Sequence, residues 1–216
     1  MKKIVFYLFI LMFLLPTPTY AWWNNTHGAL AEKVCMDFNC SCVSSMTEWA
    51  NIPDAVFKDM INHHDYNLSD SCPKSSEWVC PTKNDFKASK KMNEYLKSAS
   101  MKTGCDRWKD IGIASHYFFD TKVFWHTVQK ENYFKCHKAF EEKINNRFVS
   151  GDVDWTECTC GVCVSYDEFE PWVYEFEEKI TFEDAVTDVS LIKSSENNGL
   201  IQSILNFIDF IRGLFK

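Results

Sequence analysis

Positive charge is in short supply in this sequence. Its 216 residues include 23 Lys and Arg against 30 Asp and Glu, a net charge of −7 with histidine neutral. An acidic protein repels polyanions at long range, and binding driven by the nucleic-acid backbone needs a basic face. The composition therefore argues against loose nucleic-acid binding. It does not argue against a metal enzyme, because bound cations dominate the charge of their own site.

Long hydrophobic runs are also scarce. One uninterrupted apolar run, residues 4–15, has 12 residues, short of the roughly 20 that a membrane-spanning helix needs. It follows two lysines and precedes Thr19-Tyr20-Ala21, which is the pattern of a signal peptide cleaved after Ala21. An uncleaved membrane anchor is the alternative. We expect residues 1–21 to be a signal peptide and the protein to be secreted or on the cell surface.

The sequence has no internal repeat and no long linker, which predicts one domain over residues 22–198. Helical signals dominate, so the predicted fold class is all-α: a multi-helix domain with disulfide-rich loops. A polar stripe at spacings of three and four makes residues 199–216 an amphipathic C-terminal helix. That helix either docks on the core or lies on a membrane surface. The other helices are expected over residues 26–36, within 47–64, and over 84–100, 106–126 and 128–148, with a partly helical stretch at 169–178 and a loop or hairpin at 154–166.

Ten cysteines, all after the proposed cleavage point, are many for one domain. Export would place them in an oxidising compartment, so we expect disulfides, whose pairing the sequence does not give. The alternative for one group is a zinc knuckle of thiolates at Cys158, Cys160 and Cys163.

Two pairs of potential metal ligands stand out. His116 and Asp120 are four residues apart, and so are His137 and Glu141, with His126 between the pairs. A spacing of four puts both side chains on one face of a helix, and imidazole nitrogen and carboxylate oxygen both bind zinc. One such pair is common on helix surfaces. Two pairs and a further histidine within 26 residues, in a chain with six histidines, indicate a metal site.

The start of the expected mature chain offers further ligands. Cleavage after Ala21 frees the α-amine of Trp22, and amine and carbonyl of one residue can chelate a single ion. His27 follows five residues later. The structural alternatives are a core aromatic for Trp22 and a surface histidine for His27.

The series Trp22, His116-Tyr117, Asp120, His126, His137 and Glu141 resembles the superfamily of bacterial zinc-dependent phospholipase C and fungal single-strand-specific zinc nucleases. Two further family ligands correspond to Asp54, in Ile52-Pro53-Asp54, and to His64, with His63 as its competitor. Phe119 and Phe124 stand where the family has Gly and Pro, which predicts a straighter helix. The resemblance covers the chain from Trp22 to about Glu141.

The resemblance implies three zinc ions and a role for each ligand. Asp54, His64, His116 and Asp120 would hold the first ion, and Asp54 would also orient or deprotonate the attacking water. His126, His137 and Glu141 would hold the second. Trp22, His27 and the other oxygen of Asp120 would hold the third.

The same resemblance implies hydrolysis of phosphodiesters. The acidic charge and the wide apolar tail favour a phospholipase C-type hydrolase of phospholipids, with possible peripheral membrane contact through the tail and a monomeric state. A single-strand-specific nuclease is the first alternative. A secreted zinc-binding protein without catalysis is the second.

Overall fold

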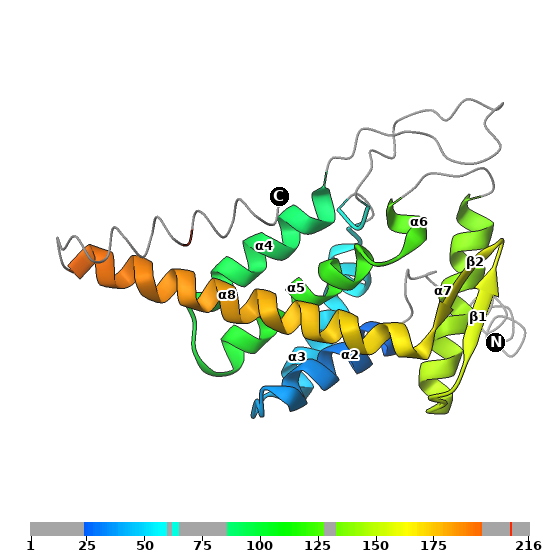
Figure 1. The fold of residues 1–216 in the computed structure, drawn as a ribbon, viewed down its shortest axis with the longest axis horizontal. Helices are drawn as coiled ribbons and strands as arrows, with labels where there is room; N and C mark the ends of the chain where they lie inside the picture. The colour runs from blue at the N-terminus through cyan, green and yellow to red at the C-terminus, as the bar shows by residue number, and fades with distance from the viewer. Residues whose placement is uncertain (1–23, 60–61, 65–85, 128–132, 196–207, 209–216) are drawn as a thin grey trace, which may run out of the picture.

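The computed structural model describes residues 24–59, 62–64, 86–127, 133–195 and 208 (Figure 1). The predicted signal peptide, Trp22 and all but Ile208 of the tail at 199–216 lie outside these residues. None of the helices in the described ranges has the length and hydropathy of a membrane span.

The described part of the chain is built from α-helices with one small hairpin, which confirms the all-α class. In chain order the elements are α2 (Asn24–Asp37), α3 (Val43–Ala50), the π-helix η1 (Pro53–Phe57), α4 (Lys87–Ser100), α5 (Gly104–Asp120), α6 (Phe124–Thr127), α7 (Tyr133–Ser150), β1 (Thr156–Thr159), β2 (Val162–Ser165), the 3₁₀ turn η2 (Tyr166–Glu168) and α8 (Phe169–Ser195).

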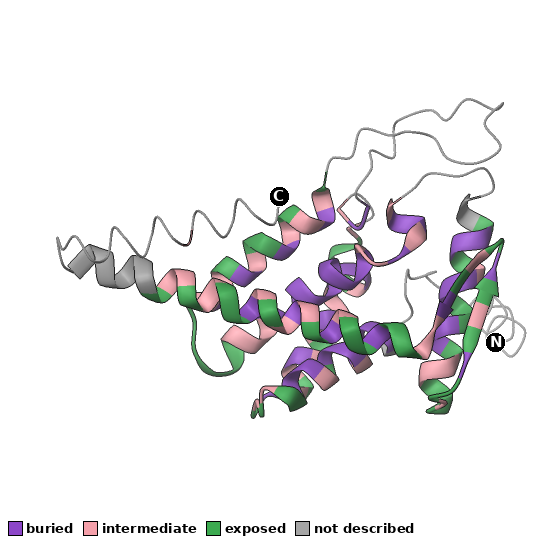
Figure 2. Ribbon diagram, viewed as in Figure 1, coloured by how far each residue is buried: buried purple, intermediate pink, exposed green. Residues whose placement is uncertain are grey.

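Helix α5 is the centre of the fold. Every residue from Asp110 to Asp120 is buried, as expected for a helix that packs on several sides. Helices α2, α3, α4 and α8 all contact it, and Figure 2 shows the buried residues concentrated on α5 and on the faces turned toward it. Polar residues carried by this helix are therefore held inside the protein.

Helix α8 is longer than expected and braces the core. It has 27 residues, where the sequence predicted a partly helical stretch of ten, and it runs from the hairpin past α5 to α4 (Figure 1). Phe176 packs against Phe118 and Phe119 of α5. Arg107 forms a bidentate ion pair with Asp184, with nitrogen–oxygen distances of 2.7 and 2.6 Å. The core contacts explain the extra length, because they bury one face of a helix whose own sequence is acidic.

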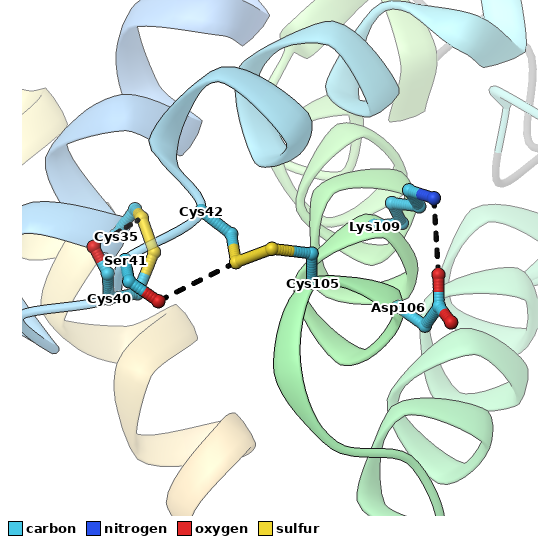
Figure 3. The surroundings of a disulfide bond; sticks show 7 residues. All are labelled: Cys35, Cys40, Ser41, Cys42, Cys105, Asp106 and Lys109. Atoms are coloured by element: carbon cyan, nitrogen blue, oxygen red, sulfur yellow. Dashed lines mark hydrogen bonds and ion pairs between the residues drawn. A yellow bond between two sulfur atoms is a disulfide. The ribbon is translucent and has the colours of Figure 1, made fainter.

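Four disulfides join the eight cysteines of the described residues, which confirms the disulfide prediction. Cys42 at the start of α3 is bonded to Cys105 at the start of α5, beside the Cys35–Cys40 bond (Figure 3). Cys136 of α7 is bonded to Cys160, and the hairpin is closed by Cys158–Cys163. The alternative of a thiolate zinc knuckle in the hairpin is therefore wrong, because all three of its cysteines are oxidised. Cys72 and Cys80 lie outside the described residues.

The helix expected over residues 106–126 is broken. Helix α5 ends at Asp120, a turn follows, and α6 begins at Phe124. Backbone amides close that turn, including a hydrogen bond from Val123 to the carbonyl of Asp120 (3.1 Å). The break lets the chain reverse, which brings His126 back toward Asp120.

Candidate metal centre

Two potential ligands project from the last turn of α5. His116 and Asp120 are completely buried, at 0% exposure, and lie one turn apart as their spacing predicted. His116 Nε2 lies 3.3 Å from Asp120 Oδ2. One histidine and one carboxylate of the site are thus held inside the buried helix α5.

The orientation of His116 depends on a close contact between two helices. Gly112, one turn before it, faces α3, where an added Cβ would lie 2.5 Å from the carbonyl oxygen of Met46. This close approach brings the carbonyl oxygen of Ala50 to 2.7 Å from His116 Nδ1, which donates a hydrogen bond to it. With Nδ1 holding the proton, Nε2 carries a lone pair toward Asp120.

A short strained segment brings Asp54 and His63 to the same place. Asp54 lies in the π-helix η1, a rare geometry that is frequent at functional sites, and η1 ends with Lys58 in the left-handed conformation (φ 49°). Asn62 then donates hydrogen bonds to the carboxylate of Asp59, at 2.8 Å from each oxygen. Tyr117 donates to Asp59 Oδ2 as well, at 2.7 Å. These contacts fix the backbone that leads into His63.

The first donor set contains Asp54, His63, His116 and Asp120, all buried. His63 Nδ1 lies 2.6 Å from Asp120 Oδ2 and 3.0 Å from His116 Nε2. Asp54 Oδ1 lies 3.2 Å from His63 Nε2 and 3.7 Å from His116 Nε2. Ligands about 2.0–2.2 Å from a tetrahedral zinc ion lie about 3.3–3.6 Å apart. The observed separations bracket that range.

This set differs from the sequence assignment in one residue. The resemblance placed His64 with Asp54, His116 and Asp120 and treated His63 as its competitor. The structure places His63 among these three residues and turns His64 elsewhere. The two histidines are adjacent in the chain, so spacing alone did not distinguish them.

The second donor set contains His64, His126, His137 and Glu141. His126 Nε2 lies 2.8 Å from His137 Nε2 and 3.4 Å from Glu141 Oε1, and His137 Nε2 contacts the same oxygen. Donor nitrogens of His64, His126 and His137 lie within 4.8 Å of one another. The Cys136–Cys160 bond anchors the start of α7 next to His137.

A third set forms around the other oxygen of Asp120. His27 Nε2 lies 3.4 Å from Asp120 Oδ1, and the imidazole ring of His27 stacks on that of His116 with centroids 3.9 Å apart. His27 is fully buried, so the surface alternative for this residue does not apply. Trp22, the other predicted ligand here, lies outside the described residues.

Burial and charge act against each other at the three carboxyl groups. Burial raises the pKa of Asp54 well above its usual range, and the His63 charge only partly opposes this. Burial would also raise the pKa values of Asp120 and Glu141, but the surrounding imidazoles outweigh it. They hold the pKa of Asp120 well below its usual range and lower that of Glu141 to about 2. At neutral pH, Asp120 and Glu141 are therefore anions.

The imidazoles also fall into two groups, one with lowered and one with raised pKa values. Burial lowers the pKa of His116 well below its usual range and that of His64 to about 2, so both rings are neutral. Burial alone would lower the pKa values of His63 and His126, but the charge of Asp120 outweighs burial and raises both. Asp120 and Glu141 together raise the pKa of His126 to about 10.

The donor chemistry fits metal ions. His116 Nε2 and Asp120 Oδ2 are both acceptors, 3.3 Å apart in a buried site. The single proton of His63 Nδ1 cannot satisfy both, whereas one cation can. Six imidazoles and three carboxylates without thiolates are ligand types that several divalent metals accept, zinc among them. These buried groups can hold metal ions.

All six histidines of the chain lie in this cluster, which we call the histidine–carboxylate centre. Sequence reasoning treated His63 and His64 as alternatives and did not foresee that both lie in the cluster, although the His-His pair itself was the available signal. It also missed the supports of the centre, the Ala50 carbonyl and the Asp59–Asn62–Tyr117 contacts. No significant match to this chain was found among protein-family models, curated proteins or solved structures.

Proposed function

We propose that this protein is a zinc-dependent phosphodiesterase that hydrolyses phospholipids in the manner of a phospholipase C. The observation that carries the proposal is the arrangement of three donor sets around one carboxylate, since Asp120 Oδ2 faces His63 and His116 while Oδ1 faces His27 and His126. Ligands shared in this way are what the resemblance implies for a three-zinc centre.

Zinc ions, when bound, supply Lewis acidity toward water and toward the oxygens of a phosphodiester. The charge balance favours an anionic substrate. Three divalent ions outnumber the charge of three carboxylates, so the loaded centre is positive although the whole chain carries −7. A positive centre in an acidic protein draws a phosphate group to that one place.

Asp54 is the residue we assign to proton transfer. It is buried, and its Oδ1 atom faces His63 and His116, so it lies where it can accept a proton from a water held by the same donor set. In the proposed reaction Asp54 Oδ1 orients the attacking water and takes its proton. His63 Nε2, 3.2 Å from that oxygen, holds the carboxyl in position.

A cavity beside the centre is the proposed place for the rest of the substrate. It has a volume of about 550 Å³ and is lined by the Asp59, Asn62 and Tyr117 contacts together with Phe57, Lys58, Lys91 and Tyr95. Tyr117 links it to the centre, because its ring lies 5.7 Å from that of His63. Phe57 is 46% exposed at the rim and offers an apolar surface to a lipid.

The same cavity also supports the nuclease alternative. Tyr95 is half-buried at the wall of the cavity and offers an aromatic ring of the kind on which bases stack. Lys58 and Lys91 beside it attract phosphate. We rank phospholipid first because of the acidic net charge.

The decisive experiment offers the zinc-loaded protein phosphatidylcholine vesicles and single-stranded DNA side by side. We expect release of the phosphorylated headgroup, no DNA degradation, and loss of activity after chelation. Asp54→Asn should be inactive, whereas Asp106→Asn, which alters an exposed carboxylate on α5, should behave as the unmodified protein. DNA cleavage alone would replace the phospholipase by the nuclease. A fully loaded protein that hydrolyses neither substrate, nor a generic phosphodiester, would be a zinc-binding protein without catalysis.

A further inference from the structure

Two adjacent histidines face two different donor sets. His63 Nδ1 lies 2.6 Å from Asp120 Oδ2, and its ring centroid is 4.8 Å from that of His116. His64 instead turns its ring toward His126, also with centroids 4.8 Å apart, and toward His137 at 6.1 Å. Both side chains are buried, at 2% and 4% exposure. Neither histidine therefore competes with the other for one position.

The backbone before this pair is held from several sides. The amide of Asp59 donates to the carbonyl of Pro53, and Asn62 donates to the Asp59 carboxylate through both its backbone and its side chain. Tyr117 of α5 holds the same carboxylate. Because this support precedes both histidines, it sets the position of His64 as firmly as that of His63.

We infer that His63 and His64 bind different ions, and that His64 is a fourth side-chain donor for the ion of His126, His137 and Glu141. The sequence resemblance gave that ion three side-chain ligands. The structure adds His64, whose donor nitrogen lies within 4.8 Å of those of His126 and His137.

Four side-chain donors complete the tetrahedron of a zinc ion. Sites of that kind are closed and structural, whereas three protein ligands leave a position for water or substrate. An ion held by all four side chains would need no ligand from solvent and would link α6 and α7 to the segment after η1. Among the described residues, the set at Asp120 Oδ1 has fewer side-chain donors, His27 and His116 beside Asp120 itself, and would keep positions open to a ligand. This inference depends on metal binding by the centre and not on the phosphodiesterase reaction.

The test measures zinc release, with no turnover assay. Zinc-loaded protein is mixed with a chromophoric chelator, and the release phases are compared among His64→Ala, His63→Ala, His137→Ala and Asp54→Asn. We expect His64→Ala and His137→Ala to accelerate the same phase by more than about tenfold, since even the loss of an outer partner of a ligand costs roughly 10- to 100-fold in metal affinity. His63→Ala is the matched control and should accelerate the phase that responds to Asp54→Asn.

Double variants sharpen the assignment. His64→Ala with His137→Ala should remove one ion from the zinc content, whereas His64→Ala with Asp54→Asn should remove two. If an alanine variant does not fold, His64→Gln and His63→Gln keep a side chain of similar size and allow the same comparison. The inference is overturned if His64 variants leave every phase unchanged, if His63 and His64 variants accelerate the same phase, or if the protein binds no zinc.

Discussion

His116 Nδ1 donates a hydrogen bond to the carbonyl oxygen of Ala50, 2.7 Å away across the contact between α5 and α3. Ala50 is the last residue of α3, so no amide of that helix can donate a hydrogen bond to its carbonyl oxygen. The helix end thus satisfies its own backbone and fixes the tautomer of a buried metal ligand with one bond.

This relationship predicts that Gly112→Ala damages the centre from a distance. The new Cβ would lie 2.5 Å from the carbonyl oxygen of Met46 and 3.2 Å from the amide nitrogen of Ala50, so α3 must move away. We expect a loss of about 1–3 kcal/mol in the free energy of unfolding, together with weaker zinc binding. Urea unfolding and zinc titration measure the two effects. Ser89→Ala on α4 should change neither, and unchanged zinc affinity in Gly112→Ala would contradict the role of the Ala50 carbonyl.

Asp120→Asn should lower the zinc content of the protein by more than one ion per chain. One carboxylate oxygen faces His63 and His116, and the other lies 3.1 Å from His126 Nδ1 and 3.4 Å from His27 Nε2. An amide keeps the size but replaces one oxygen by a donor group, which cannot bind a cation. Zinc content by elemental analysis should fall further than in Glu141→Gln, whose oxygen contacts His126 and His137 of one donor set. Equal losses in the two variants would show that Asp120 is not shared.

Zinc uptake should release protons at neutral pH. Burial lowers the pKa of His126, but Asp120 and Glu141 outweigh it and raise the pKa to about 10. Because an ion must displace this proton, apparent zinc affinity should rise with pH up to about 10. Calorimetry in buffers of different ionisation enthalpy measures the protons released. Binding heats that do not depend on the buffer at pH 7 would contradict this assignment.

The raised pKa of His126 also makes the stability of the metal-free protein depend on pH, and this stability falls as pH rises. Protonated His126 stabilises the folded state fully below its ordinary pKa of about 6.5, and this contribution is lost as pH rises through about 10. The metal-free protein should therefore lose stability between pH 6.5 and 10. The zinc-loaded protein should not follow it over that range, and urea unfolding at a series of pH values compares the two.

The Cys42–Cys105 bond should be the more stabilising of the two disulfides near α3. It closes 63 residues, against five for Cys35–Cys40. In the chain-entropy account these loops correspond to about 4 and about 2 kcal/mol in the free energy of unfolding. Replacing each pair by alanine and measuring urea unfolding gives the comparison, with Cys35/Cys40 as the control pair. A larger loss from the control pair would contradict the entropic ranking.

Local spacing predicted much of the centre because its main ligands come in helical pairs. His116 with Asp120 and His137 with Glu141 were identifiable as one-turn pairs, and the helices that carry them were expected. The break after Asp120 was not, because it depends on how α6 packs through the fully buried Trp125. The choice between His63 and His64 depends on the contacts of Asp59, which include a hydrogen bond from Tyr117 of α5, far away in the sequence. Disulfide pairing was likewise set by the approach of α3 to α5 and not by cysteine spacing.

The gathering of all six histidines into one centre makes this chain unusually simple to observe. Every imidazole resonance in a histidine-labelled nuclear magnetic resonance spectrum must come from the centre, with no background from surface residues. Occupancy by each ion, tautomer choice at His116 and protonation at His126 would appear as separate signals. The intact protein thus contains its own site-specific set of spectroscopic probes, and none has to be introduced by mutation.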